Sequence, residues 1–291
     1  MQRRQFFSSL IFGLTYGATR PLWANGAVPL VKNQTSSDAP ALAVDPQVDR
    51  EQAARMQLKI DRYNEDFPDD IFLKPEKRAL FKQVLDRISR VQTAVGYGRF
   101  NLMSFDGLLK IAAEVPEVGL FSQEEMHFIE EIFFTDAKSY GFYGEKVTDK
   151  LTTQIREKDT IKIAGSGHYL FRGRPEALYR EITRDVGNDI VLTSGIRSVV
   201  KQLHLFLLKT EATGGNLSRA SRSLAPPGHS FHGVSDFDVG KTGWGYRNFS
   251  DQFAESDVFK RLTDLGYVDI RYTRTNTYGV RFEPWHIKVS T

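Results

Sequence analysis

The 291-residue sequence contains no cysteine. Disulfide bonds, thiolate metal sites and cysteine nucleophiles are therefore excluded, and a lipoprotein anchored through a cysteine is disfavoured. Beyond the first residues, the sequence also lacks an apolar run long enough to span a membrane. With 41% hydrophobic residues, a chain of this length can bury one or two apolar cores.

An excess of charge of one sign is also absent from most of the chain. The sequence has 39 Lys and Arg against 36 Asp and Glu, but three of the arginines fall in residues 1–24, which carry no acid. Residues 25–291 therefore carry 36 charges of each sign and are formally neutral. This balance gives no support for a nucleic-acid partner.

The first 24 residues have the layout of an export signal. Arg3 and Arg4 precede an apolar run with small residues from Phe6 to Ala18, and this run is too short and interrupted to be a spanning helix. The "RRQFF" core resembles a twin-arginine signal, with cleavage expected after Ala24. An ordinary secretory signal is the alternative. Either signal predicts an exported, periplasmic protein.

The remainder of the chain divides into three regions by pattern. Residues 25–46 are rich in Asn, Ser, Pro and Ala and indicate a linker. Residues 47–145 indicate a helical domain: Leu80, Val84, Ile88 and Val91 recur at helical spacing before Gly96, and "SQEEMHFIEEIFF" begins with capping-box spacing. Residues 146–291 mix helices with short strands, among them "DIVLTSGI", "SDFDVG", "YVDIRY" and "GVRFEPWHIKV". This order predicts an α+β fold, a small antiparallel sheet with flanking helices.

A loop and strand, "PGHSFHGVSDFDVG" at residues 227–240, place two histidines and two aspartates close together in the sequence. Catalytic zinc sites take three ligands from His, Asp and Glu and leave one position for water. Of the six histidines, His229, His232 and His286 lie near acids in Gly- and Pro-rich segments. We expect the other three, His127, His168 and His204, to be structural.

The segment "RFEPWHIKV" contains a second cluster. Glu283 and His286 would point to opposite faces of a regular strand, but Pro284 marks a bulge or an edge. A kink there would turn both side chains toward one point. A histidine ligand with a glutamate base beside it is the arrangement of a water-activating zinc site.

A third segment, "TSGIRSVVKQ", carries Arg197 at a strand-to-helix turn and Gln202 on the following helix. Arginine can bind a carboxylate with two parallel hydrogen bonds. Beside a metal ion, Arg197 would select a substrate with a free C-terminal carboxylate.

Together, the three segments resemble the zinc D-alanyl-D-alanine carboxypeptidases and dipeptidases of the vancomycin-resistance type, within the wider hedgehog and lysostaphin-like group. That family reads S-G-x-R-S with a downstream Gln, then S-x-H-x-x-G-x-A-x-D, then E-x-W-H. Here "SGIRS" with Gln202 matches the first motif and "EPWH" matches the last. The resemblance covers roughly residues 185–291 and leaves the helical region outside it.

The middle motif departs from the family pattern. Ser230 and His232 fit S-x-H, but the seventh residue after His232 is Val239. Deleting one residue from the loop aligns Asp238 with the metal-binding aspartate. The rival register pairs His229 with Asp236, which are seven residues apart, but it loses the serine. We prefer His232 and Asp238.

The resemblance implies a role for each matched residue. It gives zinc as the cofactor, with His232, Asp238 and His286 as ligands and Glu283 as the general base. Arg197 would bind the terminal carboxylate or polarise the carbonyl, and Gln202 and Ser230 would orient the peptide. The expected function is a peptidoglycan D-alanyl-D-alanine carboxypeptidase that acts on stem peptides. The alternatives are a cross-link endopeptidase and a non-catalytic wall-binding or regulatory module on the same fold.

Overall fold

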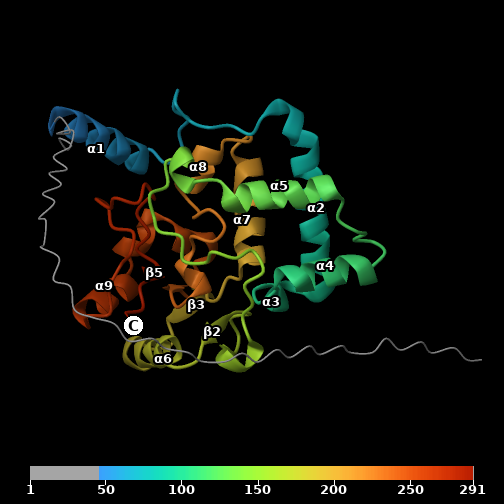
Figure 1. Cartoon of the computed structure of the whole chain (residues 1–291). Coiled ribbons are helices and arrows are strands. Elements are labelled where there is room, and N and C mark those ends of the chain that lie inside the picture. The colour runs from blue at the N-terminus through green and yellow to red at the C-terminus, as the bar shows by residue number, and fades with distance from the viewer. Residues whose placement is uncertain (1–45, 291) are drawn as a thin grey trace, which may run out of the picture. The chain divides into compact units, whose positions relative to one another are not determined.

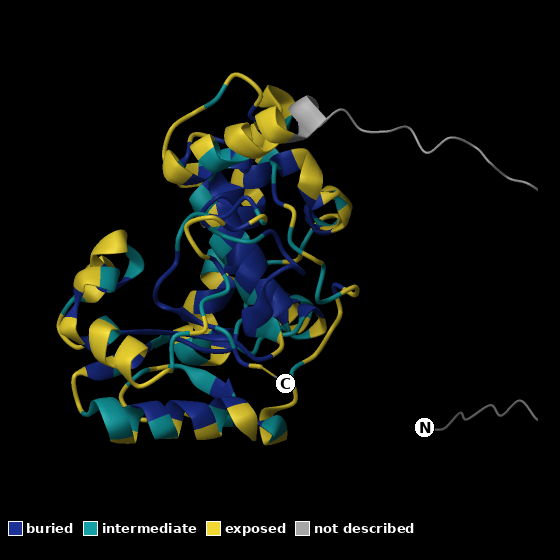
Figure 2. Ribbon diagram, turned by 90° about the vertical axis from the view of Figure 1, so that its left-hand side faces the viewer, coloured by how far each residue is buried: buried dark blue, intermediate teal, exposed yellow. Residues whose placement is uncertain are grey.

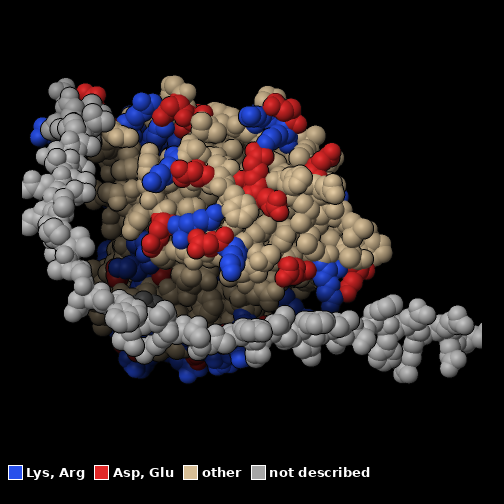
Figure 3. All heavy atoms as spheres, in the orientation of Figure 1, with Lys and Arg blue, Asp and Glu red and all other residues tan. Residues whose placement is uncertain are grey.

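The computed structural model describes residues 46–290, which belong to one compact unit. The predicted export signal and nearly all of the predicted linker lie outside the described residues. Within residues 46–290, no helix is long and apolar enough to cross a bilayer. On the face shown in Figure 3, basic and acidic side chains of this part of the chain are interspersed.

Helices dominate the first hundred described residues, as the sequence predicted: α1 (Pro46–Asp61), α2 (Arg78–Val95), α3 (Tyr97–Phe100), α4 (Phe105–Glu114) and α5 (Gln123–Phe134). The apolar stripe of α2 faces the core, where Val84, Ile88 and Val91 are fully buried. Gly96, with φ of 85°, ends the helix in a conformation that side chains disfavour. At α5, the Ser122 side chain accepts a hydrogen bond from the Glu125 amide, so the predicted capping box is confirmed.

The second half of the chain contributes α7 (Val199–Ala212) and α8 (Leu217–Ser221) to the same core as these helices. In Figure 1, α7 lies between α2 on one side and β5 on the other, and Figure 2 shows buried residues in the middle of the molecule. Leu203, Phe206 and Leu207 on α7 are fully buried in the shared core. The domain boundary at residue 146 stays a prediction.

Two small antiparallel sheets complete the fold. β1 (Thr160–Lys162) pairs with β2 (Tyr169–Phe171), and the second sheet has the order β3 (Ile190–Ser194), β4 (Phe237–Lys241), β5 (His286–Ile287). Alternate residues of β3 are buried against α6 (Arg174–Val186) and α9 (Asp257–Asp264), in a second core that includes Ile182, Leu192 and Phe237. The α+β fold class is confirmed.

Short 3-10 helices connect these elements: Pro75–Lys77, Ala137–Tyr140, Glu157–Asp159, Phe231–Gly233 (η4), Gly245–Phe249 and Asp251–Glu255. The two C-terminal strand predictions were too long. Of "YVDIRY" and "GVRFEPWHIKV", only His286–Ile287 forms a strand, and Ile270 makes a single bridge to Ile287. Pro284 lacks an N–H group and the chain turns at this residue, which interrupts the ladder.

Candidate metal centre

His232, Asp238 and His286 come together from three separate elements of the fold. His232 lies on η4, Asp238 on β4 and His286 on β5, and the β4–β5 register pairs Asp238 with His286. Each offers one ligand atom, and these atoms all lie within 4.8 Å of one another. Asp238 Oδ1 is 3.2 Å from His232 Nε2 and 3.3 Å from His286 Nδ1. All three residues are buried.

Hydrogen bonds on the far sides of the two imidazole rings orient them. His232 Nδ1 donates to the carbonyl oxygen of Gly195 at 2.8 Å, and His286 Nε2 donates to Asp236 Oδ2 at 2.9 Å. Because each ring has its N–H on that side, the lone pairs of His232 Nε2 and His286 Nδ1 are directed inward.

The inward atoms have little else to bind. His232 Nε2 and Asp238 Oδ1 are buried without a hydrogen-bond partner among residues 46–290. Buried polar atoms are rarely left in this state unless an ion or water occupies the space between them. Two imidazole nitrogens and a carboxylate oxygen are a donor set that suits a divalent transition metal such as zinc.

Glu283 reaches this centre through a tight turn. The His286 amide donates to the Glu283 carbonyl at 3.1 Å, which closes a four-residue turn with Pro284 in its second position. The turn brings both side chains to one side, and Glu283 Oε2 lies 3.8 Å from His286 Nδ1. Burial raises the pKa of Glu283 to about 7, against the lowering effect of the Arg281 guanidinium.

Arg197 is joined directly to the candidate ligand Asp238. It lies in the connection from β3 to α7, and its Nη2 donates to Asp238 Oδ2 at 2.6 Å. Its Nε donates to the Ser194 hydroxyl at 2.8 Å. These bonds leave Asp238 Oδ1 turned toward the histidines, so Arg197 positions the carboxylate. Its Nη1 makes no hydrogen bond within residues 46–290.

A small pocket of about 20 Å³ opens onto this centre, and the expected site residues Arg197, Gln202, Ser230, His232, Glu283 and His286 line it. Gln202 Nε2 donates to the Ala225 carbonyl at 2.6 Å, while Gln202 Oε1 is buried without a partner in the described part of the chain. Ser230 lies at the N-terminus of η4, close to His232 in sequence.

The rival register does not bring its two residues together. His229 Nδ1 bonds with the carbonyl oxygens of Gly144 and Glu145, and its ring packs edge-on against Phe142. Asp236 accepts a hydrogen bond from Nε2 of His286, on the opposite side of the ring from Nδ1. The geometry therefore favours His232 and Asp238.

Sequence comparison shows that the part of the chain around this centre is similar to a known family. Residues 176–290 match the model of the VanY D-alanyl-D-alanine carboxypeptidase family. Residues 176–290 are therefore similar to this family and are called the VanY-type domain below. All of the centre's side chains lie within the matched residues. No curated protein matches the sequence of this chain.

Three solved structures resemble parts of the chain. LdcB, an LD-carboxypeptidase studied for peptidoglycan recognition, has 20% identity and a TM-score of 0.37, over 44% of this chain and 63% of its own. A variant of the vancomycin-resistance D,D-pentapeptidase VanY in complex with Zn(II) has 21% identity and a TM-score of 0.36, over 46% of this chain and 82% of its own. VanYB in complex with D-alanine-D-alanine has 19% identity and a TM-score of 0.39, over 51% and 84%.

Tyr272 lines the pocket of the VanY-type domain although its sequence context gave no reason to select it. Its ring packs edge-on against His286 at a centroid distance of 5.1 Å. Burial raises the pKa of its hydroxyl group. In the sequence, Tyr272 is the last residue of the predicted strand "YVDIRY".

The histidines expected to be structural lie outside the metal centre. His204 is buried on α7 and its Nε2 is 2.9 Å from the Ser89 hydroxyl. His168 Nδ1 lies 3.4 Å from the Asn101 amide nitrogen, and burial, with the Arg197 charge, lowers its pKa to about 4. His127 is exposed on α5.

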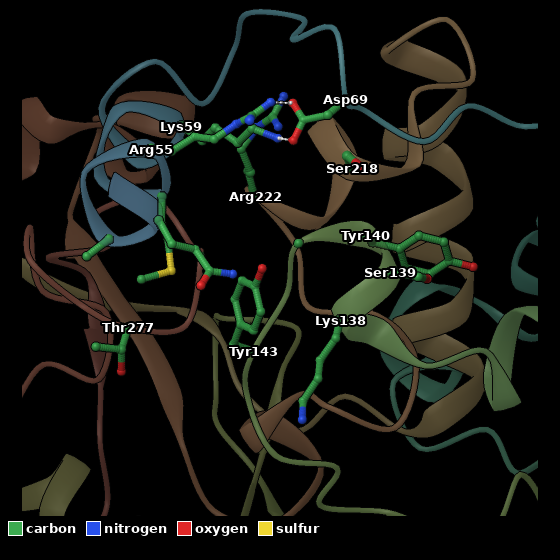
Figure 4. Close-up of a pocket in the computed structure, with 15 residues that line it drawn as sticks. Arg55, Lys59, Asp69, Lys138, Ser139, Tyr140, Tyr143, Ser218, Arg222 and Thr277 are labelled. Atoms are coloured by element: carbon green, nitrogen blue, oxygen red, sulfur yellow. Dashed lines mark ion pairs between the residues drawn. The ribbon is translucent and has the colours of Figure 1, made fainter. Parts of the chain in front are cut away.

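A larger cavity of about 570 Å³ lies beside α1, and none of the candidate site residues lines it. Figure 4 shows Arg55 and Lys59 directed toward Asp69, with separations of 2.9 and 2.8 Å. Arg222 at its edge is paired with Asp70. Three of its four cationic side chains are thus paired with acids, and Lys138 makes no ion pair in the described part of the chain. We therefore assign the chemistry to the small pocket, where buried titratable groups converge.

Proposed function

We propose that the VanY-type domain is a zinc-dependent peptidoglycan peptidase, and specifically a D-alanyl-D-alanine carboxypeptidase that removes terminal D-alanine from stem peptides. The observation that carries this proposal is the convergence of two oriented imidazoles and a carboxylate on one point, with Glu283 beside them. His232 Nε2, Asp238 Oδ1 and His286 Nδ1 would hold the ion. Bound zinc would lower the pKa of a water molecule and polarise the scissile carbonyl.

The chain's own residues supply the proton transfers. Glu283 would accept the proton of the attacking water at a carboxylate oxygen and pass it to the nitrogen of the leaving D-alanine. Its position at the wall of the pocket, 3.8 Å from a candidate ligand atom, supports this role.

Three other residues that line the pocket, Arg197, Gln202 and Ser230, would orient the substrate. Arg197 Nη1 has no partner within the described residues, so this nitrogen could donate to the substrate's terminal carboxylate without breaking the bond to Asp238. The buried Gln202 Oε1 would accept a hydrogen bond from a peptide N–H, and Ser230 would contact the same peptide. A contact between Arg197 and the substrate's terminal carboxylate would favour carboxypeptidase action, because an internal cross-link has no free carboxylate at that position.

The same proposal includes export. Residues 1–24 would direct the protein to the periplasm, by the twin-arginine route, where its peptidoglycan substrate lies. If a strain that lacks the twin-arginine translocase still exports the intact protein, this part of the proposal is wrong.

The decisive experiment is mass spectrometry of muropeptides after incubation with the wild type and with Glu283→Gln. We expect the wild type to release D-alanine from pentapeptide stems and Glu283→Gln to retain zinc with at least a 100-fold lower rate. Glu255→Gln, an exposed glutamate remote from the pocket, is the matched control and should keep full activity.

The products distinguish the alternatives. Cleavage of cross-linked dimers without release of D-alanine would indicate an endopeptidase. Bound zinc with no product from any stem peptide would favour a non-catalytic wall-binding or regulatory module.

A further inference from the structure

Asp236 is a buried carboxylate directly behind the candidate metal centre. Its Oδ2 accepts hydrogen bonds from His286 Nε2 at 2.9 Å and from Arg271 Nε at 2.7 Å. Its Oδ1 accepts from the Val289 amide at 3.0 Å and from the Ser235 hydroxyl at 3.2 Å. The residue is 1% exposed, so this set of partners fixes the carboxylate.

The residue type at this position differs from the motif that the middle segment resembles. In the register that aligns Asp238 with the family's aspartate, Asp236 stands where the family motif has alanine. A methyl group accepts no hydrogen bond, so the motif alanine could not bind the histidine in this way. The one-residue shortening and the carboxylate both lie in the segment between His232 and Asp238.

Arg271 also contacts the residue that precedes the other candidate histidine ligand. Its guanidinium carbon lies 3.4 Å from the ring centroid of Phe231, which directly precedes His232. Arg271 therefore contacts the carboxylate behind His286 and the residue next to His232 at the same time. Its side chain is 11% exposed, so both contacts are largely shielded from water.

We propose that Asp236 is a positioning residue that fixes the ring of His286, with Nδ1 toward the ion, and that Arg271 holds Asp236 in place. This inference rests on the proposed zinc site. A histidine that binds a metal generally needs an acceptor for its second ring N–H group, and loss of that acceptor typically lowers metal affinity 10- to 100-fold. Asp236 is not itself proposed as a ligand. It binds Nε2 of His286, whereas the candidate ligand atom of that ring is Nδ1, which points in a different direction.

The test compares zinc affinity in Asp236→Asn, Asp236→Ala and a matched control. The control is Asp70→Asn, another buried aspartate paired with an arginine, because Arg222 donates to it at 2.8 and 2.9 Å. Zinc affinity is measured by competition with a chromophoric chelator, and folding by circular dichroism and thermal unfolding without metal. Visible absorption of the cobalt(II)-loaded proteins reports the ligand geometry separately from activity.

We expect both Asp236 variants to bind zinc about 10- to 100-fold more weakly than the wild type and to show a changed cobalt spectrum. Asp70→Asn should lose stability and keep both properties. If folded Asp236→Asn and Asp236→Ala bind zinc as tightly as the wild type, the positioning role is wrong. The positioning role is also wrong if Asp70→Asn weakens zinc binding as much as the two Asp236 variants do. If the wild type itself binds no zinc, the proposed function fails instead.

Discussion

Gly195, in the "SGIRS" segment, offers a sharp test of how the metal centre is built. A Cβ atom at this position would lie 2.0 Å from the carbonyl oxygen of Tyr169 on β2 and 3.0 Å from its carbonyl carbon. Ordinary van der Waals contacts begin near 3.4 Å, so Gly195→Ala requires a backbone shift of more than about 1 Å. We expect Gly195→Ala to disturb both the sheet edge and the histidine.

Two hydrogen bonds would be affected by that shift. The Tyr169 carbonyl accepts from the Ile196 amide at 2.8 Å, and the Gly195 carbonyl accepts from His232 Nδ1 at 2.8 Å. Overpacking in a tight site costs about 1–3 kcal/mol. For a domain of this size that corresponds to a fall in melting temperature of about 2–12 °C. Loss of the acceptor behind His232 should also weaken zinc binding about 10- to 100-fold.

The assay is thermal unfolding with and without zinc, together with chelator competition. Gly165→Ala is the control, because φ is 75° there and nothing lies within 4 Å of the added carbon. It should cost only the backbone strain of about 1 kcal/mol and leave zinc affinity unchanged. A Gly195→Ala protein with wild-type melting temperature and wild-type zinc affinity would refute the reasoning.

Two further predictions concern stability away from the metal centre. Burial raises the pKa of Asp70, but hydrogen bonds from Arg222 and Asn216 outweigh this effect and lower it to about 2. The resulting stabilisation of about 2 kcal/mol is complete above the unfolded pKa of about 4 and is lost as the pH falls toward 2. Denaturant titrations at pH 6 and pH 3 should show about half of this loss, about 1 kcal/mol, in the wild type, and an equal loss in Asp70→Asn would contradict the assignment. Ser122→Ala removes the capping box with Glu125 and should cost about 1 kcal/mol in the same titration, whereas a change below 0.3 kcal/mol would show that the cap is unimportant.

Much of the helical region followed from local sequence patterns. The stripe of Val84, Ile88 and Val91 predicted a buried helix face, and Gly96 predicted where the helix ends. These features depend on residues within one or two turns of each other, so periodicity and capping are sufficient to find them. The last two strands were predicted too long because their alternation suited a sheet, while the turn at Pro284 removed most of the pairing.

The candidate site was partly accessible from the sequence. The "EPWH" segment predicted that Glu283 and His286 lie together, and a four-residue turn brings them to one side. The sequence did not predict that Tyr272 lines the pocket, because this residue belongs to none of the three motifs. The role of Asp236 also depended on contacts with His286, which lies 50 residues further along the chain.

The sequence by itself determined which residue types are available for chemistry, since it has no thiols and places histidines and acids in three short segments. It also determined the helices, their caps and the α+β class, because these follow from local patterns. Only the tertiary structure decided which histidine and which aspartate face each other. That choice depends on strand pairing between β4 and β5 and on the Gly195 carbonyl, 37 residues from His232, which turns the ring inward. Such long-range contacts leave no periodic trace in the sequence, because they arise only when distant segments pack together.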